Sequence, residues 1–441
     1  MNTSAVDPPG EKKRVLLLYS PSSYRSGPFL EAARKLDLDV IQGVDMPEPL
    51  AEFWHVPLGV DFNDLEQSTR AIVEYAAATS FDAIVAVDDG ATLLAARASA
   101  ALGLPHNSPD AALAARDKYV MRGMLKAGGV PVPEFRRFAA ASDPAWVAAQ
   151  VEYPCVVKPL RLSGSRGVIR ADTPEELIAA FTRTRSMLLA DGNPLEEAHL
   201  LVEQFIPGFE VALEGLLTDQ KLKVLALFDK PDPLDGPFFE ETIYVTPSRL
   251  PEATQAAIAD CTEKAALALG LREGPVHAEL RVNADGPWIV EIAGRSIGGL
   301  CSTILQFGVD MCLEELILRQ AMGLEVGAVE REQQAVGVMM IPIPGAGLLR
   351  AVHGVEDAGA TPGVVGVEIT AKLHNQVVPL PEGDSYLGFI FARGDSPARV
   401  ESALREAHQK LKFDIRPLLS ALPSAVQRSG PAADLKHQES Q

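Results

Sequence analysis

Two glutamates in the segment HAELRVNADGPWIVEIAGRSIGG, residues 277–299, have the spacing of facing positions in a β-hairpin. If residues 284–286 (ADG) form a three-residue loop, Glu279 and Glu291 lie opposite each other on one face of the sheet. Like charges that face each other destabilise a strand pair, here by about 1 to 3 kcal/mol at a separation of roughly 5 Å. A divalent cation held by carboxylate oxygens removes that cost, so the pair predicts a Mg²⁺ site. A two-residue turn over 285–286 is the alternative, and it would put the carboxylates on opposite faces.

A lysine interrupts the apolar stretch CVVKPL at position 158. Burying an unpaired ammonium is costly, so Lys158 needs either an anionic ligand or a carboxylate partner. The turn SGSRGV follows, and small residues there let backbone N–H groups approach phosphate oxygens. Glycine-serine loops are common, so the turn favours phosphate binding only together with Lys158. The turn residues are Ser163, Gly164, Ser165 and Gly167.

The stretch LVEQFIPGFEVAL places Glu203 at the end of one apolar strand and Glu210 at the start of another. The chain turns sharply at 207–208, Pro-Gly, and so exposes backbone groups with which an adenine ring could form hydrogen bonds. An ordinary hairpin flanked by glutamates is the alternative. The exposed backbone belongs to Gln204, Phe205 and Ile206.

Three further charged residues lie at expected strand ends. Arg295 follows Glu291 by four residues and precedes the glycine-rich SIGG. Its guanidinium could donate a fork of hydrogen bonds to a phosphoryl group, or it could pair with Glu291. Asp88 and Asp89 end the apolar run FDAIVAV, where parallel sheets gather ligands, although Asp89 could instead cap the next helix.

The elements that must position these residues fall into three units. Residues 14–115 alternate short apolar runs with helical periodicity, which predicts an open parallel sheet. GGVPVPEF, residues 128–135, breaks that pattern and marks a boundary. A second unit of antiparallel strands then leads to a helix at roughly 310–322, and a smaller α+β unit covers 335–420. Residues 1–10 and 422–441 resemble flexible tails.

Composition narrows the function classes. The chain has 441 residues with 47% hydrophobic and 22% charged, as in a globular protein of several domains. Its net charge of -19 argues against a nucleic acid or an anionic membrane as partner. Membrane-spanning helices are not expected. Reduced core thiols and a cytoplasmic location are expected from Cys155, Cys261, Cys301 and Cys312, which lack CxxC spacing.

In their order and spacing, these segments resemble the ATP-grasp superfamily from about residue 14 to 420. The resemblance rests on GLPHNSPDAALAARDKYVMRGMLKAGGVPVPEF, VVKPLRLSGSRGV, VEQFIPGFEVALEGL and HAELRVNADGPWIVEIAGRSIGG. It implies an α/β and α+β chain with an ATP-grasp fold. A Rossmann-like domain is expected over 11–116, an ATP-grasp domain over 117–325 with a lid at about 150–207, and a C-terminal α+β domain over 326–421.

The resemblance also implies roles for single residues. Lys118 and Lys158 would contact ATP phosphates under a flap formed by 163–167. Glu203 to Ile206 would hold adenine, and Glu210 the ribose. Glu279 and Glu291 would bind Mg²⁺, for which Mn²⁺ can substitute, and Arg295 would stabilise the reacting phosphoryl group. The substrate contacts would come from Asp88, Asp89, His277, Ser296, Gly298 and Gly299.

Within the superfamily, the chain resembles the L-amino-acid ligase branch most. This resemblance rests on the segments EIAGR, FDKPDPLDGPFFEE and EGDSYLGFIFARG. The resemblance implies an ATP-dependent carboxylate-amine ligase that joins small molecules, with amino acids as the expected substrates, through an acyl phosphate. A homodimer is the default assembly. Ala293 stands where the family usually has a metal-binding asparagine. A bicarbonate-using carboxylase is an alternative, disfavoured in its self-contained biotin form because no Met-Lys-Met segment is present. A nucleotide-binding sensor without turnover is the other alternative.

Overall fold

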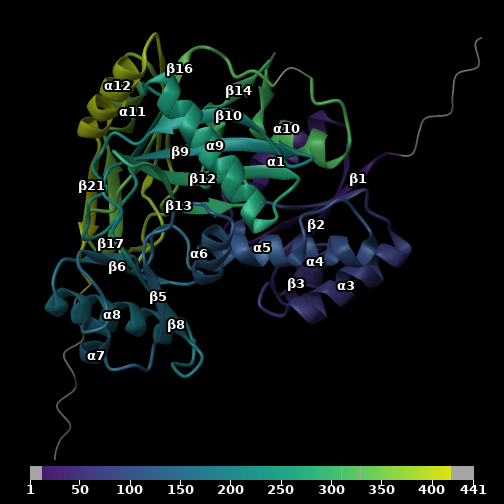
Figure 1. Ribbon diagram of the computed structural model, residues 1–441. Helices are drawn as coiled ribbons and strands as arrows, with labels where there is room; N and C mark the ends of the chain where they lie inside the picture. Colours follow the sequence, from purple (N-terminus) through teal and green to yellow (C-terminus); the bar gives the residue numbers. More distant parts are fainter. Residues whose placement is uncertain (1–11, 309, 328, 419–441) are drawn as a thin grey trace, which may run out of the picture.

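The computed structural model describes residues 12–308, 310–327 and 329–418 (Figure 1). The predicted tails, 1–10 and 422–441, lie outside the described residues. Three sheets carry most of the strands: a parallel sheet near the N-terminus, a small sheet between residues 135 and 204, and a large central sheet. The expected ATP-grasp architecture, with its parallel N-terminal sheet, is confirmed.

The N-terminal sheet has four strands in the order β3-β2-β1-β4, and every strand pair is parallel. The apolar run of β1 is buried along its length because helices cover both faces of the sheet. The strands are β1 (Arg14–Tyr19), β2 (Asp39–Asp45), β3 (Leu58–Val60) and β4 (Ala83–Ala86). The helices are α1 (Ser26–Lys35), α2 (Glu48–Phe53), α3 (Leu65–Ala78), α4 (Thr92–Leu102) and α5 (Pro109–Arg116).

The small sheet lies at the lower left of Figure 1 and contains most of the predicted lid, about 150–207; we call residues 135–204 the lid. Its strand order is β5-β8-β6-β7, and α8 packs on it through Leu177 and Phe181. Thr173 accepts a hydrogen bond from the backbone of Glu176 and so caps α8. The elements are β5 (Phe135–Ala139), α7 (Pro144–Ala148), β6 (Cys155–Pro159), β7 (Ile169–Ala171), α8 (Pro174–Ala190) and β8 (His199–Gln204).

The central sheet has eight strands in the order β13-β12-β9-β10-β11-β16-β20-β18. Its first strands come from the middle of the chain and its last three from the C-terminal region, so the two regions share one sheet. The strands are β9 (Phe209–Thr218), β10 (Lys221–Asp229), β11 (Ile243–Thr246), β12 (Gly274–Asn283), β13 (Gly286–Ala293), β16 (Ala335–Ile341), β18 (Val364–Ile369) and β20 (Gly388–Gly394).

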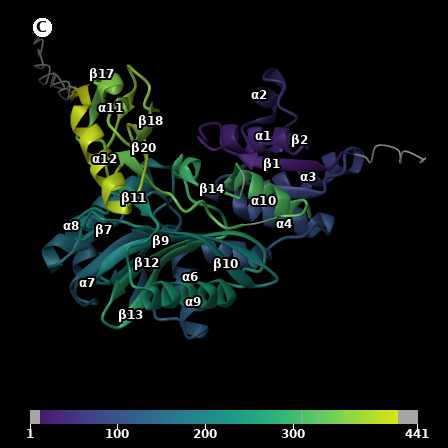
Figure 2. The ribbon, with the colours of Figure 1, turned by 90° about the horizontal axis from the view of Figure 1, so that it is seen from above.

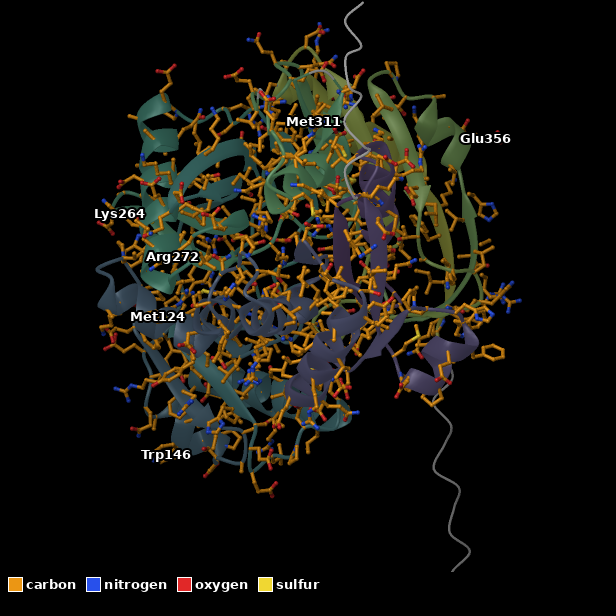
Figure 3. All side chains as sticks on the ribbon, turned by 90° about the vertical axis from the view of Figure 1, so that its right-hand side faces the viewer. Met124, Trp146, Lys264, Arg272, Met311 and Glu356 are labelled. Atoms are coloured by element: carbon orange, nitrogen blue, oxygen red, sulfur yellow. The ribbon has the colours of Figure 1, made fainter. Side chains whose placement is uncertain are left out.

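Different layers cover the two faces of the central sheet. Helices α5, α6 (Lys118–Ala127) and α9 (Glu252–Leu269) pack on one face. Helices α1 and α10 (Leu313–Ala321) share a hydrophobic core with the opposite face. Figure 2 shows the N-terminal domain rising from that opposite side. Helices α11 (Val355–Gly359) and α12 (Pro397–Lys410) form a separate core with β11, β16 and β20 on the other face, which contains Met339 and Ile390, whereas Val338 and Phe391 face the core of α1 and α10. Figure 3 shows Met124 of α6 next to α9, on which Lys264 points outward.

The remaining strands form two smaller sheets. A three-stranded sheet has the order β19-β17-β21, and β14 pairs with β15. Their bounds are β14 (Gln306–Phe307), β15 (Met311–Cys312), β17 (Gly347–His353), β19 (Gln376–Val377) and β21 (Lys412–Arg416). None of the helices in the described part of the chain has both the length and the apolar character needed to cross a bilayer.

The hairpin of β12 and β13 corrects one sequence prediction. Its loop has two residues, 284–285, because Asn283 pairs with Gly286; the predicted three-residue loop is wrong. A ladder continued from that turn would pair Glu279 with Val290. A β-bulge between Glu279 and Leu280 shifts the register by one residue, however, and Glu279 pairs with Glu291 after all. The bulge, rather than the loop, sets the facing pair.

Candidate functional site

A cavity of about 580 Å³ opens between the lid, the central sheet, the N-terminal domain and the C-terminal region. Most of the predicted site residues line it although they come from distant parts of the chain. These residues are Asp88, Asp89, Lys118, Lys158, Ser163, Gly164, Ser165, Glu203, Gln204, Phe205, Ile206, Glu210, His277, Glu279, Glu291, Arg295, Gly298 and Gly299.

Two other predicted residues lie behind the cavity wall. The backbone N–H of Gly167 donates to the carbonyl of Pro381 at 2.9 Å, which ties the turn to the C-terminal region. The hydroxyl oxygen of Ser296 accepts a hydrogen bond from Arg25 at 2.5 Å. Both residues therefore support the wall, and their predicted direct contacts with ATP or substrate have no counterpart in the cavity lining.

Strand alternation aims the side chains of β12 and β9 into the cavity. On β12, Val276, Ala278 and Leu280 pack in the core under α9. The residues between them, including His277 and Glu279, face the other way and line the cavity. Two-residue periodicity thus separates the core from the site along a single strand.

The turn at 163–167 lies between β6 and β7 and has three residues in the left-handed region, two of them glycines, which adopt it without strain. Gly164, Ser165 and Gly167 have φ values of 61°, 55° and 72°. Serine adopts this left-handed region at a cost on the order of 1 kcal/mol, and such strain is found where backbone groups serve a ligand. The neighbouring Arg166 donates to the carbonyl of Glu382 at 2.7 Å, so the turn is held against the C-terminal region.

Glu203 is buried between two cations. Arg122 binds both of its carboxylate oxygens, at 2.7 and 3.0 Å, and Lys158 Nζ lies 2.6 Å from Oε1. Burial alone would raise the pKa of Glu203, but Arg122 and Lys158 outweigh it and lower the pKa to about 2. A carboxylate partner for Lys158, one of the two alternatives above, is thus present in the chain, and the ammonium still lines the cavity.

Removing this carboxylate is expected to destabilise the fold. In a Glu203→Ala variant, Arg122 and Lys158 would stay buried without their shared anion, at a cost of about 3 to 5 kcal/mol. Urea unfolding measures the loss. The matched control is Glu134→Ala, since the Glu134 side chain is 86% exposed and lies 3.8 Å from the exposed Lys126; its expected change is below about 1 kcal/mol. Equal stability of the two variants would contradict this assignment.

Three carboxylates meet at the centre of the cavity. Oxygen atoms of Glu210, Glu241 and Glu279 lie within 4.8 Å of one another. The ammonium of Lys230 lies among them, 2.9 Å from Glu210 and 3.3 Å from Glu279, and it also contacts Glu241. Such hard oxygen donors are those that Mg²⁺ prefers, so the donor set fits a divalent cation.

Lys118 and Glu291 form a further ion pair in the wall of the cavity. Lys118 begins α6 after its cap Asp117, and its Nζ donates to the carbonyl of Leu162 at 2.7 Å. The same nitrogen lies 3.3 Å from Glu291 Oε2. The second glutamate of the hairpin is thus balanced by a lysine from a different element, which explains how the facing pair Glu279 and Glu291 is tolerated.

Arg295 is directed toward the N-terminal domain. Its Nε lies 3.4 Å from Asp89 Oδ1, and another of its nitrogens donates to the carbonyl of Ser296 at 3.0 Å. Burial by itself would lower the pKa of Arg295. The carboxylates of Asp89 and Glu291 raise the pKa by more than burial lowers it, so the net shift is upward. The Arg295 guanidinium therefore remains a cation beside the cavity.

The predicted substrate contacts Asp88 and Asp89 have different partners in the structure. Asp88 accepts hydrogen bonds from Ser20 N–H at 2.8 Å and from the Ser23 hydroxyl at 2.6 Å, and so shapes the loop after β1. Asp89 begins a short 3-10 helix and faces Arg295. The loop shaped by Asp88 also lines the cavity, through Ser20 and Tyr24 among others.

Family models match three regions of the chain. The model described as "ATP-grasp N-terminal domain" matches residues 30–106, "ATP-grasp domain" matches 151–304, and "L-amino acid ligase C-terminal domain 2" matches 339–416. The chain belongs to the ATP-grasp superfamily. The third match lies in the region whose strands complete the central sheet, and it places the resemblance in the L-amino acid ligase branch.

Individual relatives agree with this assignment. An alanine-anticapsin ligase of Bacillus subtilis is 28% identical over 68% of this chain and 68% of its own length. An uncharacterized protein, y4rH of Sinorhizobium fredii, is 25% identical over 71% of this chain and 64% of its own length. The chain thus spans slightly under two thirds of that relative. The crystal structure of an L-amino acid ligase from Bacillus licheniformis superimposes with a TM-score of 0.76 at 26% identity, covering 92% of this chain and 99% of that one.

The structure also brings to the cavity and its walls residues that the sequence analysis did not select. Lys230 follows the apolar strand β10, which is the signal that identified Lys158. Arg122 lies one helical turn after Lys118 on α6, and the same face of the helix could have suggested it. The loop at 20–25 follows β1 at the carboxyl edge of the parallel sheet, where the rule applied to Asp88 and Asp89 also points. Glu241 ends the segment FDKPDPLDGPFFEE, residues 228–241, which carries part of the family resemblance, but nothing within that segment distinguished this glutamate from its neighbours.

His277 makes the stability of this ATP-grasp domain depend on pH. Burial would lower the pKa of His277, but Glu214 and then Glu279 outweigh it and raise the pKa from 6.5 to about 9. The stabilisation is fully present below pH 6.5 and lost as the pH rises through about 9. We expect roughly 3 kcal/mol of unfolding free energy to disappear over this range.

Urea unfolding with a metal chelator present, between pH 6 and pH 10, measures this loss. The His277→Gln variant should show a flatter profile, whereas replacement of the exposed His353 by Gln should leave the wild-type profile unchanged. A His277→Gln profile as steep as that of the wild type would show that other groups cause the dependence.

Proposed function

We propose that this chain is an ATP-dependent carboxylate-amine ligase. A substrate carboxylate oxygen attacks the γ-phosphorus of ATP, the bond to the β-phosphate oxygen breaks, and ADP leaves with an acyl phosphate formed. An amine nitrogen then attacks the acyl carbon, phosphate leaves, and the proton lost from nitrogen passes to solvent. One observation carries the proposal: the turn at 163–167, two lysines, the paired carboxylates and Arg295 all line the same cavity.

The nucleotide is assigned to the end of the cavity near the lid. The backbone N–H groups of Gln204 and Phe205 already donate to the carbonyls of Glu134 and Pro154, both at 2.9 Å. The proposed adenine contacts therefore fall to Ile206 N–H and to carbonyl oxygens of this segment. Glu210, at the start of β9, is the proposed ribose contact.

The phosphates are assigned to the cations at the middle of the cavity. Lys158 and Lys118 would contact them, and the turn at 163–167 would cover them. Glu279 and Glu291 are the proposed metal ligands, and bound Mg²⁺ would neutralise phosphate charge during transfer. Arg295 would stabilise the negative charge that develops on the transferred group. The enzyme would thus act by position and charge rather than by a covalent intermediate with the protein.

The substrates are assigned to the end formed by the N-terminal domain and the C-terminal region. Asp89, the loop at 20–25 and the glycines at 298–299 line this end. A relative named for joining alanine to anticapsin supports amino acids as the substrate class. Asp89 is the proposed amine contact, since Asp88 is engaged by the loop that it shapes.

Incubation of the purified chain with ATP, Mg²⁺ and pooled amino acids tests the proposal. Phosphate release and product masses should show amide formation that depends on both an acid and an amine. ADP formation that requires bicarbonate and yields no amide would instead support a carboxylase. Nucleotide binding without ADP formation across all pools would support the sensor alternative.

A further inference from the structure

The ammonium of Lys230 is the resident cation of the three-carboxylate cluster. Its side chain is 2% exposed, and its Nζ lies 2.9 Å from Glu210 and 3.3 Å from Glu279, with Glu241 also in contact. The backbone N–H of Lys230 donates to the carbonyl of Glu210 at 3.3 Å, which anchors the residue at the end of β10. Three donors on one nitrogen thus meet three carboxylates.

A divalent ion cannot share this position with the ammonium. Mg²⁺ binds oxygen ligands at about 2.0 to 2.1 Å and requires a nearly ideal octahedral arrangement of them. The three carboxylates offer oxygen atoms within 4.8 Å of one another, and Nζ already occupies the space among them. Two cations in so small a space repel each other strongly, so one of them must leave.

We propose that Lys230 competes with the metal ion. It keeps free divalent cations out of the three-carboxylate cluster, and so away from Glu279, until a nucleotide brings one to the proposed ligands Glu279 and Glu291. The part that concerns the nucleotide rests on the proposed function, whereas the competition itself concerns the free chain. A polyphosphate supplies new anionic oxygens to the displaced ammonium, so neither cation is left buried and unpaired after the exchange. The Tyr244 ring, whose centre is 4.9 Å from Nζ, offers a further cation-π contact nearby.

Mn²⁺ binding to the nucleotide-free chain tests this inference by electron paramagnetic resonance. Lys230→Met keeps an unbranched apolar side chain that is one atom shorter and removes the ammonium, so it should bind Mn²⁺ at least about tenfold more tightly than the wild type. Added Mn²⁺ should also raise the melting temperature of the variant more than that of the wild type. Equal or weaker binding by a folded Lys230→Met variant would overturn the proposal.

A second variant covers the case in which three unbalanced carboxylates prevent folding. The double variant Lys230→Met with Glu241→Gln has two carboxylates and no ammonium, which matches the net charge of the wild-type cluster. Tighter Mn²⁺ binding than in the wild type would then show that the position of the ammonium, and not the net charge, excludes the metal. Binding no tighter than in the wild type would contradict the proposal.

This outcome can be separated from that of the ligase assay. Tighter Mn²⁺ binding in both variants, combined with wild-type protein that forms no amide from any pool, would support the role of Lys230 and count against the proposed function. Amide formation by the wild type, combined with unchanged Mn²⁺ binding in the variants, would give the opposite result.

Discussion

An Arg295→Ala variant is expected to turn over about a thousandfold more slowly than the wild type while it binds ATP with unchanged affinity. Arg295 carries a positive charge at the junction of the proposed phosphate and substrate ends, and its side chain is 13% exposed. Loss of this charge removes an interaction that strengthens as the phosphoryl group is transferred. Steady-state kinetics should therefore show a lower kcat with little change in the KM for ATP.

The fold should tolerate this change. Asp89 would lose its partner at 3.4 Å but keep Arg116, whose Nε lies 3.9 Å away. The matched control is Arg272→Ala, because Arg272 is an exposed arginine that Figure 3 places at the surface. Arg295→Lys retains the charge without the fork of donors, so its rate should be intermediate. A kcat for Arg295→Ala within tenfold of the wild type would remove Arg295 from the proposed catalytic group.

A Glu291→Gln variant is expected to lose turnover by at least about a thousandfold and to remain folded. The amide keeps the shape of the side chain but removes the charge needed to hold a divalent cation. Lys118 would still donate to the carbonyl of Leu162 at 2.7 Å, so no ammonium would be left without a partner. Phosphate release measures activity, and circular dichroism checks the fold.

The control for this variant is Asp285→Asn, which removes one carboxylate from the exposed tip of the same hairpin. It should retain wild-type turnover. Raised Mg²⁺ concentration should partly restore the rate of Glu291→Gln if the loss lies in metal affinity. Full activity of Glu291→Gln at low Mg²⁺ would show that this carboxylate is not a metal ligand.

Local patterns were sufficient to predict the elements that carry the site. The apolar runs that end at Asp88 and contain Lys158 form β4 and β6, because short apolar runs bounded by turn residues bury well as strands. The lysine in such a run already required an anion nearby. The order of the motifs was enough to predict the ATP-grasp fold, which the structure and the family matches confirm.

The hairpin shows where local reasoning reached a correct pairing by a wrong route. Glu279 does face Glu291, but through a bulge that compensates for a two-residue loop. Bulges depend on how a strand packs against its neighbours; here the carbonyl of Val290 accepts a hydrogen bond from Arg122 at 2.9 Å. Because Arg122 lies 168 residues away in the chain, no inspection of the hairpin alone could reveal this contact.

Residue types and spacing alone therefore determined which strands this protein forms and which charged groups they carry, since these depend on neighbours within a few residues. Only the tertiary structure decided the partners of those charges. Lys158 and Arg122 share Glu203, Lys118 balances Glu291, and Lys230 lies among carboxylates from β9, β12 and the irregular segment before β11. Electrostatic energy depends on distance in space, and distances between side chains from different elements are set by the packing of three sheets around one cavity.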